Sequence, residues 1–233
     1  MKADGSLLPT TGKSVVIALL DELVPQNLMC QLNENGNEVF SKKCLVIDGM
    51  AVVQDISAVR NFQSYNELGA AIVKLINFKS RGYDVTRVIF DNYSVENSMK
   101  DATRERRRGS KSIVKVYKVD YNTKIKSMKQ FLASFVTKDL LTLYLSQVLI
   151  EHADAHIITA THQAVMCNCQ EVVSPGVSSQ EEDDTLMILL ATESVKDGSV
   201  VHIYSQHTDV LLLALRRVPL LGRSPAMLMG TSD

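Results

Sequence analysis

Short apolar runs alternate with longer amphipathic segments along most of this chain. The runs at residues 44–47 and 87–90 are largely apolar, and an aspartate follows each of them, Asp48 and Asp91. Runs of this length are typical of strands that are buried on both faces of a parallel sheet. Residues 65–79, which lie between them, carry apolar side chains at the spacing of one helix face, and this pattern predicts an amphipathic helix.

The same alternation continues along the chain and predicts an α/β fold, a single three-layer domain with a mostly parallel central sheet flanked by helices. The other predicted strands are residues 156–160, 171–173 and 200–205, and the other predicted helices are residues 49–59, about 123–151 and about 181–194. Residues 208–215 are expected to form a helix or a short apolar segment. We expect residues 1–43 to be an N-terminal extension that packs on the core, residues 44–218 to form the core, and residues 219–233 to be a C-terminal tail.

Composition narrows the class of protein. Hydrophobic residues make up 45% and charged residues 22% of the 233 positions, so disordered and fibrous classes are excluded. No window reaches about 18 uninterrupted apolar residues and no signal peptide opens the chain, so we expect no membrane partner. Four cysteines do not make a disulfide framework, which favours an intracellular protein of the nucleus or the cytoplasm.

Two of these cysteines, Cys167 and Cys169, follow His162 at a spacing that could indicate a zinc site. A fourth ligand and a second pair of ligands are missing from the surrounding sequence. Because strands bury small cysteines routinely, a packing role is the favoured interpretation.

Acidic residues gather where predicted strands end. Asp48 and Asp91 each follow a strand, Asp209 lies just beyond another, and the run EEDD at residues 181–184 opens a helix. The carboxyl ends of parallel strands share the edge of the sheet where open α/β folds bind ligands. Any one of these acids could be only a helix cap or a turn residue. Together they predict a site for two hard divalent cations, Mg²⁺ or Mn²⁺, which can activate water on a phosphodiester.

A strongly basic stretch follows the second of these strands. Residues 100–129 contain eleven lysines and arginines against three acids, a net charge of +8 in a chain whose net charge is −1. Lys100, Arg104, Arg107 and Lys111 fall at helical spacing and could line one face. A basic segment beside an acidic pocket suits the phosphate backbone of DNA or RNA. A solvated surface or a localisation signal is the alternative.

Taken in order, these motifs resemble the PIN-like nuclease superfamily, in particular its flap-endonuclease-like branch. The resemblance is carried by VIDG at residues 46–49, VIFDN at 88–92 with the basic stretch after it, SQEEDDT at 179–185 and TDVL at 208–211. It extends from about residue 44 to residue 215, and it looks most like poorly characterised animal and mobile-element-associated members.

The resemblance implies a PIN-like core with a basic helical arch at about residues 97–130, and it also implies roles for individual residues. Metal binding and catalysis would be carried by Asp48, Asp91, Glu182, Asp184 and Asp209, with Glu181 as a neighbouring metal ligand. The residues that hold nucleic acid would be Lys100, Arg104, Arg106, Arg107, Arg108 and Lys111.

Two departures from the family pattern bear on activity. His207 stands where the family has the first acid of an Asp-x-Asp pair, and imidazole suits zinc or manganese better than magnesium. His207 is therefore either an altered metal ligand or a neutral neighbour of the site. The chain also stops at Asp233, before the further helical region of the family. We expect either a truncated tail or a missing surface that a partner protein or a second copy supplies.

Three functions follow from the sequence. The first is a metal-dependent nuclease acting on DNA or RNA by a two-metal mechanism. The second is a catalytically degenerate PIN-like fold that serves as a nucleic-acid-binding or protein-interaction module. The third is a phosphatase with Asp48 as nucleophile, which is disfavoured because that chemistry generally needs a second acid two residues later, where this chain has Met50.

Overall fold

The structure of this chain, a computed structural model, describes residues 42–91, 93, 116–120, 123–125, 127–161, 164–169, 183–217, 221 and 226–228. All of them belong to the unit Ser41–Asp233, one of two compact units into which the chain divides. The described elements are β1 (Lys43–Asp48), α2 (Gly49–Val59), α3 (Tyr65–Lys79), β2 (Val85–Ile89), α5 (Met128–Phe131), α6 (Phe135–His152), β3 (Ile157–Ala160), β4 (Val165–Cys167), α7 (Asp183–Lys196), β5 (Val200–Tyr204), α8 (Thr208–Arg217) and β6 (Ala226–Leu228).

The strands form one six-stranded sheet in the order β4-β3-β2-β1-β5-β6. The pairs β1–β2, β1–β5, β2–β3 and β5–β6 are parallel, and β4 alone runs antiparallel to its neighbour β3. The predicted α/β fold with a mostly parallel sheet is therefore confirmed. The chain moves from β1 through β2 to β3 in one direction across the sheet, and it builds β5 and β6 on the other side of β1.

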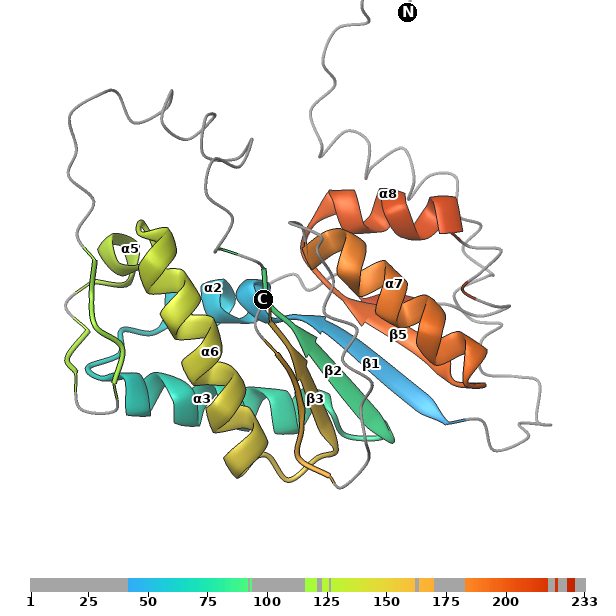
Figure 1. The fold of residues 1–233 in the computed structure, drawn as a ribbon, viewed down its shortest axis with the longest axis horizontal. Helices are drawn as coiled ribbons and strands as arrows, with labels where there is room; N and C mark the ends of the chain where they lie inside the picture. Colours follow the sequence, from blue (N-terminus) through green and yellow to red (C-terminus); the bar gives the residue numbers. More distant parts are fainter. Residues whose placement is uncertain are drawn as a thin grey trace, which may run out of the picture. The chain divides into compact units, whose positions relative to one another are not determined.

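Apolar side chains of the central strands cover both faces of the sheet, which gives the three layers (Figure 1). Along β1, Leu45 and Ile47 belong to one cluster with residues of α2, α3 and α6. Cys44 and Val46, which alternate with them, belong to a second cluster with residues of α7 and α8. This period-two alternation with apolar residues on both faces is what a strand buried between two helical layers requires.

Four of the described helices, α2, α3, α5 and α6, carry polar N-caps that the hydropathy pattern did not reveal. The helix expected at about residues 123–151 is wrong in its first third, because the chain forms the short α5 and then restarts as α6. Ser134 causes the restart, since its Oγ accepts a hydrogen bond from the backbone N–H of Thr137 at 3.3 Å. The helices predicted at 49–59 and 65–79 are confirmed at both ends.

Two short strands at the edges of the sheet were not predicted. β4 and β6 are each three residues long, too short to show an alternating pattern. The strand predicted at residues 171–173 lies outside the described residues, as do most of the expected basic arch and the N-terminal extension. None of the described helices is both long enough and apolar enough to span a bilayer.

Gly49, the first residue of α2, lies against the ring of Phe90. A Cβ added at Gly49 would come within 2.6 Å of Phe90 Cδ1, and the same ring presents two further carbons to it. Phe90 is itself buried and held by a hydrogen bond from its backbone N–H to the carbonyl oxygen of Ala160. The turn after β1 therefore packs directly on the segment that leads from β2 into Asp91.

We expect Gly49→Ala to lower the free energy of unfolding by about 1–3 kcal/mol, because the added methyl group must displace a buried ring. Urea unfolding followed by circular dichroism measures this change. Gly69→Ala in α3 is the matched control, since its Cβ would meet Val148 Cγ1 at 3.2 Å and the substitution favours the helix. Equal effects of the two substitutions would contradict the prediction.

Candidate functional site

Asp48 connects the end of β1 to the start of α2, and its side chain is completely buried, with 0% exposure. Its Oδ1 accepts a hydrogen bond from the backbone N–H of Ala51 at 2.8 Å, so the residue is the N-cap of α2. The helix cap provides a hydrogen-bond partner for Oδ1 but none for the second carboxylate oxygen.

The second oxygen of Asp48, Oδ2, is buried and receives no hydrogen bond from the part of the chain that the structure describes. His207 Nε2 lies 3.4 Å from this oxygen, close enough for an ion pair when the imidazole is protonated, although the two atoms do not form a hydrogen bond. The His207 side chain is 47% exposed, whereas the Asp48 side chain is fully buried. A buried carboxylate oxygen without a donor costs free energy unless a cation reaches it.

Burial raises the pKa of Asp48 to about 6, mainly because the charged form loses its hydration. The hydrogen bond from Ala51 and the charge of His207 act in the opposite direction, and the charges of Asp91 and Asp184 raise the pKa further. The charge of Asp48 is therefore repelled by two other carboxylates, each of which comes from a different element of the fold.

One of these two carboxylates follows the carboxyl end of β2, and the other lies in the first turn of α7. Asp91 follows β2 and is half-buried, and its Oδ2 accepts a hydrogen bond from the hydroxyl group of Tyr93 at 3.1 Å. Asp184 is half-buried in the first turn of α7. Elements separated in sequence by more than 130 residues thus bring acids to the carboxyl end of β1.

The position in the sheet is the one where open α/β folds place ligands. The chain runs to one side of β1 through β2 and to the other side through β5, so the connections diverge between β1 and β5. Divergent connections leave a crevice beyond the carboxyl ends of these strands. Asp48 ends β1, and His207 follows β5, so the two residues come from the two strands between which the connections diverge.

The remaining predicted residues divide into two groups. Asp209 is exposed in the first turn of α8, two residues after His207, and its charge is not among the causes that shift the pKa of Asp48. The others lie outside the described residues: Glu181, Glu182, Lys100, Arg104, Arg106, Arg107, Arg108 and Lys111.

Sequence reasoning missed the residues that hold the loop before His207. Asp55 in α2 accepts hydrogen bonds from the Tyr204 hydroxyl group at 3.3 Å and from Gln206 Nε2. Ser205 is buried, and its Oγ accepts a hydrogen bond from the backbone N–H of His207 at 3.1 Å. Asp55 contacts residues about 150 positions away, so no local pattern could have indicated its role.

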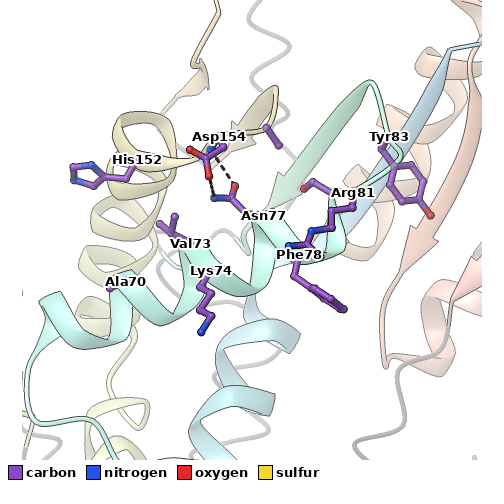
Figure 2. A pocket seen from close by; sticks show the side chains of 11 residues that line it. Ala70, Val73, Lys74, Asn77, Phe78, Arg81, Tyr83, His152 and Asp154 are labelled. Carbon is purple, nitrogen blue, oxygen red and sulfur yellow. Dashed lines mark hydrogen bonds between the residues drawn. The ribbon is translucent and has the colours of Figure 1, made fainter.

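A depression of about 720 Å³ lies at the opposite end of the sheet, between the last turns of α3 and the segment that joins α6 to β3 (Figure 2). Asn77 and Asp154 join its two walls, since Asn77 Nδ2 donates to Asp154 Oδ2 at 3.0 Å and the Asp154 backbone N–H donates to Asn77 Oδ1 at 3.1 Å. Lys74 and Arg81 give it a basic rim. None of the strand-end acids lines it, so it is separate from the carboxylate site.

Comparison with known proteins adds no assignment. No family model matches the chain, and neither a curated protein nor a solved structure matches it significantly. The geometry of the described residues is therefore the basis for any functional conclusion.

The raised pKa of Asp48 predicts the pH dependence of stability. A folded-state pKa near 6 against an ordinary value of 3.8 means that the native carboxylate costs about 3 kcal/mol above pH 6, and that this cost disappears as the pH falls toward about 4. Asp48→Asn keeps the acceptor for Ala51 and removes the charge. We expect it to raise the free energy of unfolding by about 1–3 kcal/mol at neutral pH and to have little effect near pH 4.

Urea unfolding of the metal-free protein between pH 4 and pH 8 measures this difference. Asp197→Asn, at an exposed position after α7, is the matched control and should show no such dependence. A destabilising effect of Asp48→Asn that is the same at every pH would show that the charge of Asp48 is not the cause.

Proposed function

We propose that the protein is a metal-dependent nuclease that hydrolyses phosphodiester bonds of DNA or RNA, possessing a PIN-like core and acting on particular nucleic-acid structures. The observation that carries this proposal is the buried Oδ2 of Asp48, which lacks a donor among the described residues and faces the charges of Asp91 and Asp184. A buried carboxylate that also interacts with two negative charges is costly unless a cation is bound near it.

The chemistry of the donors fits a hard divalent cation. Carboxylate oxygens are the ligands that Mg²⁺ and Mn²⁺ prefer, and the described donors are Asp48, Asp91 and Asp184, with Asp209 nearby in sequence after β5. By resemblance, Glu181 and Glu182 would complete the set. When bound, such ions lower the pKa of a coordinated water molecule and neutralise charge on a phosphate.

The chain's own residues divide the remaining work. Asp48 fixes the start of α2 and holds a negative charge at the centre of the site. His207 stands at the solvent edge, where it can contact a phosphate as a cation or bind a metal as a neutral imidazole. Nucleic acid would be held by the basic residues of the expected arch, which follow Asp91 in the sequence: Lys100, Arg104, Arg106, Arg107, Arg108 and Lys111. Such a substrate places the protein in the nucleus or the cytoplasm.

A second candidate function rests on His207. The His207 imidazole lies 3.4 Å from Asp48 Oδ2, and its charge, when it is protonated, offsets part of the charge that a metal cation would otherwise neutralise. A PIN-like fold that has a histidine at position 207, where the family has an acid, could bind nucleic acid or another protein without cleaving a substrate. Binding that weakens steeply with salt, without cleavage in any divalent ion, would favour this module.

Cleavage of labelled single-stranded, duplex and flap substrates by the full chain tests the nuclease proposal. We expect cleavage that requires Mg²⁺ or Mn²⁺ and falls by about 100-fold or more in Asp48→Asn and in Asp91→Asn, because each removes a carboxylate from the site. Asp197→Asn should cleave as the unaltered chain does. Cleavage that persists in a folded Asp48→Asn protein would refute the assignment.

His207→Asp separates the two candidate functions. The substitution replaces an imidazole with an oxygen ligand, so we expect cleavage in Mg²⁺ to rise about tenfold or more and the preference for Mn²⁺ to diminish. The new charge should also destabilise the metal-free protein, since it removes the cation that lowers the pKa of Asp48 and adds a like charge. Activity that stays absent in His207→Asp, in a protein that still binds nucleic acid, would favour the binding module.

A further inference from the structure

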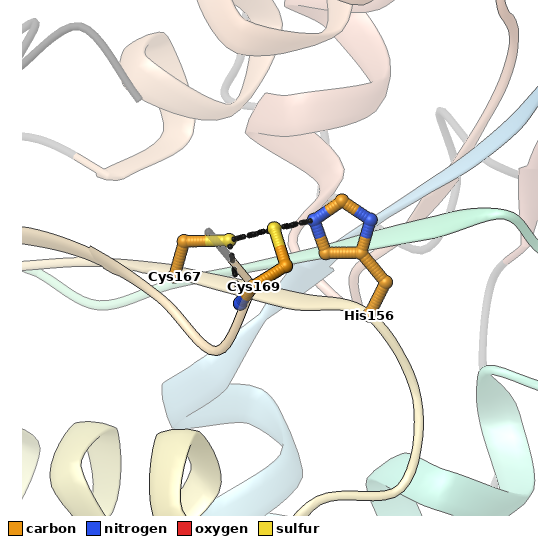
Figure 3. Close-up of side chains that lie close together, drawn as sticks. All are labelled: His156, Cys167 and Cys169. Carbon is orange, nitrogen blue, oxygen red and sulfur yellow. Dashed lines mark hydrogen bonds between the residues drawn. The ribbon is translucent and has the colours of Figure 1, made fainter. Parts of the chain in front are cut away.

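A second cluster of metal-binding side chains lies at the other end of the sheet. His156 immediately precedes β3, Cys167 ends β4, and Cys169 follows two residues later. Their side chains converge, and all three are half-buried (Figure 3). The Cys169 Sγ lies 2.9 Å from His156 Nε2, the Cys167 Sγ lies 3.4 Å from the same nitrogen, and the two sulfur atoms are 2.7 Å apart.

The ligand set points to a different class of metal from the one that the carboxylates would bind. Thiolate sulfur and imidazole nitrogen bind zinc strongly and bind magnesium or calcium poorly. The sequence had suggested His162 as the histidine partner of these cysteines, but His162 lies outside the described residues. The antiparallel pairing of β4 with β3 brings His156 to the cysteines, with Ile158 opposite Cys167.

Asn168, the residue between the two cysteines, fixes their turn to the segment that carries His156. Its Nδ2 donates to the carbonyl oxygen of Ala155 at 2.7 Å, and its Oδ1 accepts from the backbone N–H of Ile157 at 2.9 Å. The residues on both sides of His156 are thus tied to one asparagine side chain. This arrangement positions all three ligands before any metal is bound, as the supporting hydrogen bonds of metal sites do.

A backbone donor also approaches the sulfur of Cys167. The N–H of Cys169 donates to the Cys167 Sγ at 3.3 Å, a hydrogen bond that favours the thiolate form which a metal requires. Tetrahedral coordination of zinc places two thiolates about 3.8 Å apart, so the sulfur atoms need to separate by about 1 Å. Both cysteines lie at the end of a short edge strand, and rotation about their Cα–Cβ bonds can supply that movement.

We propose that His156, Cys167 and Cys169 bind a zinc ion. Among the described residues no fourth metal-binding side chain joins the cluster, so water or another donor completes the coordination. The ion would connect the start of β3 to the end of β4 and hold this edge strand on the sheet. The proposal does not depend on the proposed nuclease function, because the cluster lies at the amino end of β3 and the carboxylates lie at the carboxyl ends of β1 and β2.

Cobalt substitution tests the proposal through a signal that only thiolate ligands give. The full chain, reduced and freed of metal by chelation, is titrated with Co²⁺ and then with Zn²⁺. We expect a thiolate-to-cobalt charge-transfer band and tetrahedral d–d bands that reach their maximum at about one Co²⁺ per chain and disappear when Zn²⁺ is added. Zn²⁺ should also raise the Tm and slow amide exchange in β3 and β4.

Matched variants assign the ligands. Cys167→Ser, Cys169→Ser and His156→Ala should each weaken Co²⁺ binding by about 100-fold or more, and Asn168→Ala should weaken it by about 10–100-fold. His152→Ala and Cys44→Ala are the controls, since His152 is an exposed histidine at the end of α6 and Cys44 is buried in the second apolar cluster. Both should bind Co²⁺ as the unaltered chain does.

Three outcomes would overturn the proposal. The first is a reduced chain that gives no charge-transfer band, and the second is a band that survives in the Cys167→Ser/Cys169→Ser double variant. The third is a Cys167–Cys169 disulfide, found by mass spectrometry, that re-forms in the presence of excess Zn²⁺. If the ligand variants fail to fold, the unaltered chain still decides, because the band and the Zn²⁺-dependent rise in Tm are measured on it directly.

Discussion

The burial of one carboxylate, that of Asp48, constrains much of the structure around it. Its Oδ1 caps α2, so the helix cannot begin where it does without an acceptor at this position. Its Oδ2 is also buried and receives no hydrogen bond from the described residues. The hydrogen bond to Oδ1 stabilises the start of α2 and also holds Oδ2 in place. The helix cap therefore keeps an unfavourable buried charge at the carboxyl end of β1.

The packing around Asp48 determines which charged groups lie near its Oδ2. Phe90 packs against Gly49, which keeps the end of β2 close to the turn after β1 and brings Asp91 toward Asp48. On the other side, Asp55 and Ser205 hold the loop that ends at His207. The contact of Phe90 with Gly49 is neutral and buried, yet its effect is electrostatic, because it sets the distance between groups that would repel one another.

Local patterns predicted the parts of this arrangement that depend on neighbouring residues. The apolar runs ending at Asp48 and Asp91 predicted two central strands, and the helical period of residues 65–79 predicted α3 at both ends. The break between α5 and α6 could not be predicted, since it depends on the choice of Ser134 as a cap within an apolar sequence. Asp55 and His156 could not be identified either, because their partners lie on other elements and are chosen by strand pairing and helix packing.

The two proposed metal sites occupy opposite ends of the same sheet and differ in ligand type, and this difference bears on how one chain could hold two metals. Zinc binds most divalent sites more strongly than magnesium or manganese does, so an acidic site in a cell is exposed to competition from zinc. Zinc would bind to the softer ligands His156, Cys167 and Cys169 in preference to the carboxylates. His207 is the exception at the acidic end, since an imidazole beside Asp48 Oδ2 makes that site more attractive to zinc than oxygen ligands alone would. The identity of the residue at position 207 therefore affects both the charge balance around Asp48 and the selectivity of the carboxylate site between hard and borderline cations.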